Sequence, residues 1–139
     1  MKRAFLLTLL LVLFLAACGG DDGGNGDGGA EDVSLSFSGN DSLEFDPSSA
    51  SAPAGANVTV NFDNAGALEH SWVLMTGDID PLTATEADAL NNASSGVVPA
   101  GESTSFSFTA PDPGTYQYVC TVPGHAAGGM VGTLTVNGN

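Results

Sequence analysis

The sequence predicts an all-β protein, an antiparallel β-sandwich with one short helical insertion. Three observations carry this prediction: short runs in which apolar and polar residues alternate, turn-forming residues between those runs, and a length that suits one domain. The 139 residues can bury one hydrophobic core, because a domain of about 100 residues folds without disulfides. Evenly spaced short strands with turns between them are typical of sandwiches.

The predicted strands begin with residues 33–37, in which Val33, Leu35 and Phe37 share one face. Every second side chain of a half-buried strand points into the core, which produces this alternation. Further strands are predicted at residues 58–62, 70–75, 104–108, 115–120 and 132–136. Turn residues such as "PDPG" at 111–114 separate them.

Residues 80–96 depart from the strand pattern. They are rich in alanine, and Pro81 lies near their start. Thr83 and Glu86 are spaced as in a capping box, in which the two side chains satisfy the first backbone N–H groups of a helix. The sequence therefore predicts one short helix here, inserted between strands and ending near Asn92.

The first 17 residues predict an export signal. Lys2 and Arg3 precede an apolar run from Ala4 to Ala17, and that run is short for a membrane span, which needs about 20 residues. Residues 18–30, rich in glycine and aspartate, predict a flexible spacer with a reach of roughly 20 Å. Residues 31–139 are then the folded domain.

The signal ends in "LAAC", residues 15–18. This motif resembles the lipobox of bacterial lipoproteins, in which the cysteine is acylated and becomes the new first residue. The resemblance implies lipidation of Cys18 and an exported domain tethered to a bacterial membrane, on its periplasmic or extracellular face. Acylation by more than one chain is enough for stable anchoring.

The charge of the chain restricts its partners. Removing the signal takes away Lys2 and Arg3, the two basic residues, and changes the net charge from −14 to −16. Nucleic acid is excluded as a partner by repulsion, whereas a basic protein would be attracted. Solubility in a salty or acidic environment explains the same composition equally well.

Cys120 is the one cysteine left once Cys18 is assigned to lipid. An unpaired thiol in an exported protein needs protection, and metal ligation would supply it. His125 and Met130 follow in the loop before the last strand, and His70 opens another strand. If the sandwich brings them together, one thiolate, two imidazoles and a weak thioether form the ligand set of a blue copper site.

Each of these residues also has a simpler explanation. A lone buried cysteine is usually a small apolar side chain, and His70 or Met130 could simply pack in the core. If no metal bound here, such explanations would have to hold at once for His70, Cys120, His125 and Met130. Structural zinc favours two or more thiolates, and a nucleophilic Cys–His pair would need an activating environment that this strand end lacks. Copper is therefore the predicted cofactor, and Met75 is a poor rival to Met130 because it lies on the opposite strand face from His70.

These residues resemble the cupredoxins, the blue copper proteins with a Greek-key sandwich. "HSWVL" at 70–74 resembles their first ligand strand, and "GTYQYVCTVPGHAAGGM" at 114–130 resembles their second ligand loop. Four residues separate Cys120 from His125, and four separate His125 from Met130. This spacing is that of the auracyanins, which are membrane-associated, and differs from plastocyanins and azurins. The resemblance implies that His70, Cys120, His125 and Met130 bind one copper ion that alternates between Cu(II) and Cu(I).

Two positions depart from the family pattern. Ser71 stands where an asparagine usually ties the two ligand segments together, and its shorter side chain is expected to reach less far. Val119 stands where plastocyanins expose an aromatic residue to their partners.

The resemblance implies a monomeric one-electron carrier and not an enzyme. Its partners would be redox proteins, with a basic cytochrome or a membrane electron-transfer complex as candidates. A copper storage or delivery module would use the same ligands but would exchange its metal readily. A copper enzyme would need a further open metal site, and the chain has no third histidine to build one.

Overall fold

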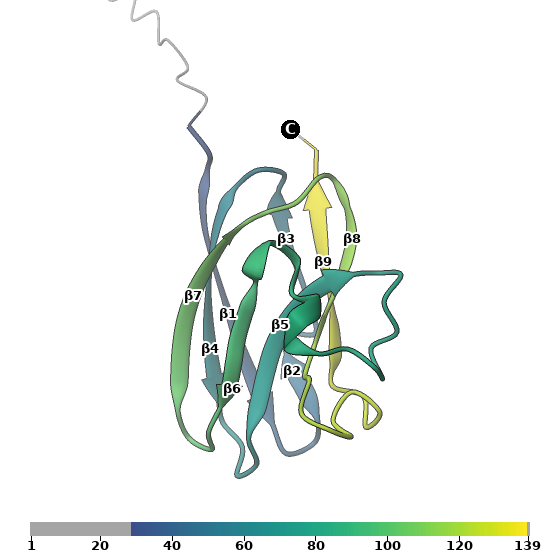
Figure 1. The fold of residues 1–139 in the computed structure, drawn as a ribbon. Helices are drawn as coiled ribbons and strands as arrows, with labels where there is room; N and C mark the ends of the chain where they lie inside the picture. Colours follow the sequence, from purple (N-terminus) through teal and green to yellow (C-terminus); the bar gives the residue numbers. More distant parts are fainter. Residues whose placement is uncertain (1–28, 139) are drawn as a thin grey trace, which may run out of the picture.

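The computed structural model describes residues 29–138, which form two β-sheets packed face to face (Figure 1). The strands are β1 (Asp32–Asn40), β2 (Glu44–Asp46), β3 (Ser49–Pro53), β4 (Asn57–Asn64), β5 (His70–Thr76), β6 (Ser94–Val98), β7 (Ser103–Thr109), β8 (Gly114–Val119) and β9 (Val131–Asn137). One sheet has the strand order β2-β1-β4-β7 and the other β3-β9-β8-β5-β6. The predicted sandwich is confirmed. The predicted signal, Cys18 and most of the spacer lie outside the described residues.

The core lies between the sheets and is dominated by aromatic side chains. Trp72 of β5 is fully buried and stacks on Tyr118 of β8, with ring centroids 5.0 Å apart. Phe37 of β1 packs against both, at 5.3 and 4.9 Å. Large aromatic rings bury more apolar area than other side chains, and tilted or offset pairs add to that gain. The strands that carry the metal ligands are therefore fixed to a well-packed core.

Both sheets of the sandwich are mixed, because the predicted antiparallel pairing does not hold for two strand pairs. β1 runs parallel to β4, and β3 runs parallel to β9. Alternating side chains show which face of a strand is buried, and this signal is the same in parallel and antiparallel pairs. The direction is set instead by the chain crossing from one sheet to the other between β2 and β3.

The predicted helix is also wrong in form, because the insertion contains two separate 3-10 turns, η1 (Glu86–Asp88) and η2 (Leu90–Asn92). The capping pair is Thr85 and Asp88, whose carboxylate accepts from the Thr85 backbone at 2.8 Å. Asn91 has a positive φ of 53°, and its side chain donates to the carbonyl of Thr109 at 2.8 Å. The bond from Asn91 to β7 is a tertiary contact, and such contacts can override the helical propensity of a segment.

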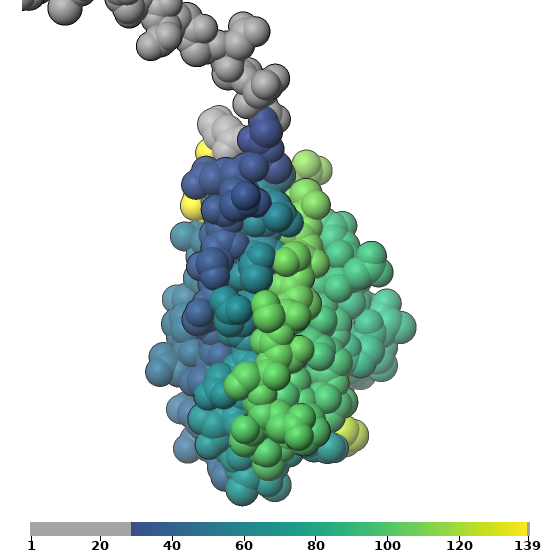
Figure 2. Space-filling model, turned by 90° about the vertical axis from the view of Figure 1, so that its left-hand side faces the viewer, coloured from purple at the N-terminus to yellow at the C-terminus, as the bar shows by residue number. Residues whose placement is uncertain are grey.

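The insertion covers the outer face of β5, where it forms a bulge on the side of the sandwich (Figures 1 and 2). Residues 70–75 of β5 are consequently buried on both faces. Ser71, Val73 and Met75 alternate with the core-facing side chains and would otherwise be exposed to solvent.

Both described chain ends lie at one end of the sandwich, and the loop between β8 and β9 lies at the other, the lower end in Figure 1. The loop between β4 and β5, which leads into His70, lies at the same lower end. Among residues 29–138, no helix is long and apolar enough to cross a membrane.

Candidate metal centre

Three of the predicted ligands come together at the lower end of the sandwich. His70 is the first residue of β5, Cys120 directly follows β8, and His125 lies in the loop before β9. The Nδ1 atoms of His70 and His125 are 3.1 Å apart, and Cys120 Sγ lies 3.5 Å from His125 Nδ1. All three ligand atoms lie within 4.8 Å of one another. One metal ion can therefore contact all three.

The loop that carries two of these ligands is closed by its own backbone. Met130 donates its N–H to the carbonyl of His125 at 3.1 Å, and its carbonyl accepts from the N–H of Cys120 at 3.1 Å. The turns on either side of His125 use Gly124 and Gly129, which have φ values of 87° and 112°. Such positive angles suit glycine, because it has no side chain to clash with the backbone. The hydrogen bonds fix the ligand spacing before any metal binds.

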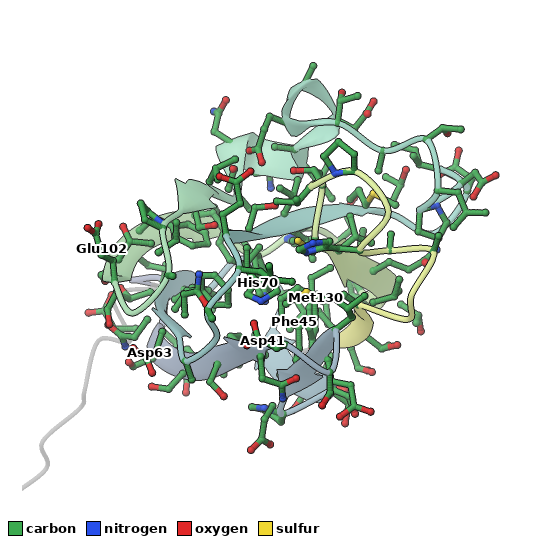
Figure 3. The ribbon with its side chains drawn as sticks, turned by 90° about the horizontal axis from the view of Figure 1, so that it is seen from below. Asp41, Phe45, Asp63, His70, Glu102 and Met130 are labelled. Carbon is green, nitrogen blue, oxygen red and sulfur yellow. The ribbon has the colours of Figure 1, made fainter. Side chains whose placement is uncertain are left out.

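Met130 is fully buried at the same end of the molecule. Figure 3 shows it close to His70 in the view from below. Its terminal methyl lies so near β1 that a side chain at Gly39 would begin 2.8 Å from it. The thioether is thus confined inside the end of the sandwich, and its role as the weak fourth ligand stays a prediction.

Ser71 links the two ligand segments, although its side chain is shorter than the asparagine expected there. Its backbone N–H points at Cys120 Sγ, 3.3 Å away. Its hydroxyl oxygen accepts the N–H of Thr121 at 2.9 Å and contacts the Thr121 hydroxyl at 2.8 Å. The serine hydroxyl therefore reaches the segment that carries Cys120 through both the backbone and the side chain of Thr121.

Glu86, in the insertion, extends this network. Thr121 donates its hydroxyl to Glu86 Oε1 at 2.7 Å, and Ser94 donates to the other carboxylate oxygen. From its spacing, Glu86 is expected in a helix cap, and the expected ligand set does not include Thr121. The position of Thr121 directly after Cys120 is a signal that could have found it, since ligand-bearing segments are usually held by outer hydrogen bonds, but no such signal marks Glu86.

In the absence of metal, the surroundings of Cys120 and His70 favour the neutral form of each side chain. Burial raises the pKa of the Cys120 thiol, and the nearby charge of Glu86 acts in the same direction. Burial lowers the pKa of His70, and the neighbouring His125 lowers it further. A bound cation would displace the thiol proton, because a metal stabilises the thiolate. Two neutral imidazoles and one soft thiolate suit copper in both of its oxidation states.

The likeness to known proteins agrees with this geometry. Residues 31–137 match the family of copper binding proteins of the plastocyanin/azurin type. The chain belongs to this family, the cupredoxins, and its cofactor is copper.

Within the family, the chain is similar to the auracyanins. It is 42% identical to auracyanin-B of Chloroflexus aurantiacus, over 69% of this chain and 48% of that protein. It is 34% identical to auracyanin-A of the same organism, with 97% of both chains covered. A crystal structure of dithionite-reduced auracyanin from Roseiflexus castenholzii has a TM-score of 0.66 and 30% identity, covering 78% of this chain and 99% of that one. The chain thus spans about half of auracyanin-B and nearly all of auracyanin-A, and the predicted likeness is confirmed.

Proposed function

We propose that this chain is a monomeric one-electron carrier, in which a single copper ion cycles between Cu(II) and Cu(I). The observation that carries the proposal is the convergence of His70, Cys120 and His125, held by two strands and a hydrogen-bonded loop. Copper would supply the redox couple, and the protein would keep its ligands in nearly one arrangement for both states. A site that rearranges little on reduction suits rapid electron transfer. Met130 completes the proposed ligand set.

His125 is the proposed port for electrons. Among the four proposed ligands it is the one whose side chain is partly exposed, while the other three are buried. The surface beside it is made of small residues, including exposed Pro123 and Ala127. A partner could therefore approach the imidazole edge closely. Val119 is fully buried, which leaves it unable to serve as a partner contact.

A pair of variants with equal charge tests this port. Ala127→Lys places a positive charge beside His125, and Thr135→Lys places the same charge on exposed β9 toward the other end. Stopped-flow mixing of the reduced protein with an oxidised basic c-type cytochrome would measure the transfer rate. We expect Ala127→Lys to slow the reaction at least threefold more than Thr135→Lys, by like-charge repulsion at the contact. Equal rates for the two variants would refute the proposal that electrons pass through His125.

The same experiment separates electron transfer from copper delivery. An electron carrier reduces one cytochrome per protein and keeps its copper. A delivery module would instead release copper to a Cu(I) chelator within the reaction time. Loss of the metal without reduction of the cytochrome would overturn the proposed function.

We further propose that the exported domain is tethered by lipid at Cys18. The motif at residues 15–18 supports this, together with the position of β1, which begins at the end of the sandwich opposite the loop between β8 and β9 (Figure 1). A tether leaving from that end would turn the electron port away from the membrane. Cys18→Ser should move the protein from the membrane fraction to the soluble fraction of a bacterial host. Identical fractionation of the variant and the wild type would exclude the lipid.

A further inference from the structure

One polar atom at the metal centre is unexplained by the ligand set. His70 presents Nδ1 toward His125 and Cys120, and its other ring nitrogen, Nε2, is buried without a hydrogen-bond partner among the described residues. A buried N–H that gives up its hydrogen bond to water costs about 1–3 kcal/mol. Metal-bound histidines usually direct this second nitrogen at a carboxylate or a carbonyl.

Asp41, in the loop between β1 and β2, faces that nitrogen. Its Oδ1 lies 3.9 Å from His70 Nε2, and its side chain is 49% exposed. Figure 3 shows both residues at the end of the sandwich. The separation is roughly 1 Å longer than a hydrogen bond, so the contact is electrostatic at this distance. A small movement of either side chain would turn it into a bond.

The carboxylate of Asp41 is held in this position by the loop that leads into His70. It accepts the backbone N–H of Ala67 at 2.8 Å and that of Leu68 at 3.1 Å, both at Oδ1. These two bonds lower the pKa of Asp41, with a smaller contribution from His70. The charge is therefore present at neutral pH and cannot swing freely into solvent.

Gly66 leaves the space in which the two side chains meet. A β-carbon at this position would lie 3.1 Å from His70 Nε2 and closer still to Asp41 Oδ1. Any side chain larger than hydrogen would have to displace one of the two groups. The loop is thus built to allow the carboxylate and the imidazole to approach each other.

We propose that Asp41 is a positioning residue for His70. The negative charge of Asp41 keeps the proton of His70 on Nε2, so that the unprotonated Nδ1 faces copper. The same negative charge stabilises Cu(II) more than Cu(I) and so lowers the reduction potential. This inference rests on the proposed binding of copper by His70. It assigns to Asp41 a role outside the ligand set, in setting the tautomer and the potential.

In the copper-free protein, the two histidines then hold their protons differently. His70 carries its proton on Nε2, so its Nδ1 accepts from the Nδ1–H of His125 across the 3.1 Å contact.

Asp41→Asn removes the negative charge but keeps the loop in place, because the amide oxygen can still accept the backbone N–H groups of Ala67 and Leu68. Asp63→Asn is the matched control: it removes an exposed acid at the same end of the molecule (Figure 3), one that bonds to Ser103 at 2.6 Å. Reduction potentials of the copper-loaded full-length proteins would be compared. Nitrogen-15 spectra of the copper-free proteins would report the tautomer of His70.

We expect Asp41→Asn to raise the ratio of Cu(I) to Cu(II) affinity at least threefold, where tenfold corresponds to about 59 mV. Asp63→Asn should change this affinity ratio by less than half of the change that Asp41→Asn produces. His70 should be in the Nε2–H form in the wild type and in Asp63→Asn, and in a mixture in Asp41→Asn. Asp41→Glu, which keeps the charge, should restore part of the wild-type potential.

Equal shifts in the two asparagine variants, or an unchanged tautomer in Asp41→Asn, would overturn the proposal. So would an Nδ1–H tautomer in the wild type, a result that requires no variant to fold. The tautomer measurement uses copper-free protein, so it still decides the role of Asp41 if the wild type fails to bind copper. That failure would count against the proposed function.

Discussion

At the scale of single residues, the protonation of Cys120 sets how copper binding depends on pH. Burial holds the pKa of this thiol above its ordinary value, so the thiol is protonated at neutral pH and loses its proton when copper binds. His70, whose pKa is lowered, is already neutral. Below the thiol pKa the apparent affinity should therefore rise about tenfold per pH unit, and it should level off above that pKa. Competition with a chelator between about pH 7 and 9 would measure the slope. An affinity independent of pH would show that no thiol proton is released.

Met130→Leu tests the weak fourth ligand. Leucine nearly conserves the buried volume, so the fold should lose less than about 1.5 kcal/mol. The trigonal ligands stay in place, and the copper protein should keep its colour. Without the thioether, Cu(II) loses a donor and the reduction potential should rise, because the axial ligand tunes it. Voltammetry of wild type and variant decides this, and identical potentials would remove Met130 from the ligand set.

At the scale of elements, the insertion and the ligand loop are coupled through Thr121. Thr121→Val keeps the side-chain shape and removes the hydroxyl bonds to Ser71 and Glu86, while the backbone bond to Ser71 remains. This loss should cost about 1–2 kcal/mol of unfolding free energy and speed the loss of copper. Thr59→Val is the control, since it removes a 2.9 Å bond to Ser107 between β4 and β7, on the other sheet. Denaturant unfolding and chelator-driven copper release would be measured. The coupling is refuted if both variants release copper at the wild-type rate.

The sequence pattern predicted the six longer strands correctly. In β1, β4, β7 and β9 the pattern reflects the burial of alternate side chains, whereas β5 is buried on both faces. The sequence did not predict β2, β3 and β6, because β2 is only three residues long and β3 and β6 are built largely from serine, alanine and glycine. The predictions of strand direction and of the form of the insertion were wrong for a related reason. Both depend on contacts between segments distant in sequence, which local patterns do not encode.

At the metal centre, too, some residues could be predicted from local sequence and others could not. His70, Cys120 and His125 were predictable because the chain has so few histidines and cysteines, and because their loop spacing is distinctive. Asp41 and Glu86 were not, because they are two among 16 acidic residues. Only the fold shows which carboxylates approach the ligands.

At the scale of the whole molecule, charge repulsion should govern stability. No Lys or Arg occurs after residue 3, so the folded domain holds its acidic side chains without the usual cationic partners. Salt screens such repulsion, with a Debye length near 10 Å at about 0.1 M. Raising NaCl from about 10 to about 500 mM should therefore raise the melting temperature by several degrees, each kcal/mol corresponding to about 4–8 °C. Calorimetry would show this, and a flat or falling trend would contradict it.

The central claim is that one copper ion is held by the Cys120 thiolate and two imidazoles, and titration with Cu(II) tests it most directly. Absorption spectra of the folded full-length protein would be recorded as Cu(II) is added, with Cys120→Ser as the matched variant. We predict an intense visible band, from charge transfer between sulfur and Cu(II), that saturates at one ion per chain and is missing in Cys120→Ser. A folded wild-type protein that stays colourless with Cu(II) in excess would contradict the account.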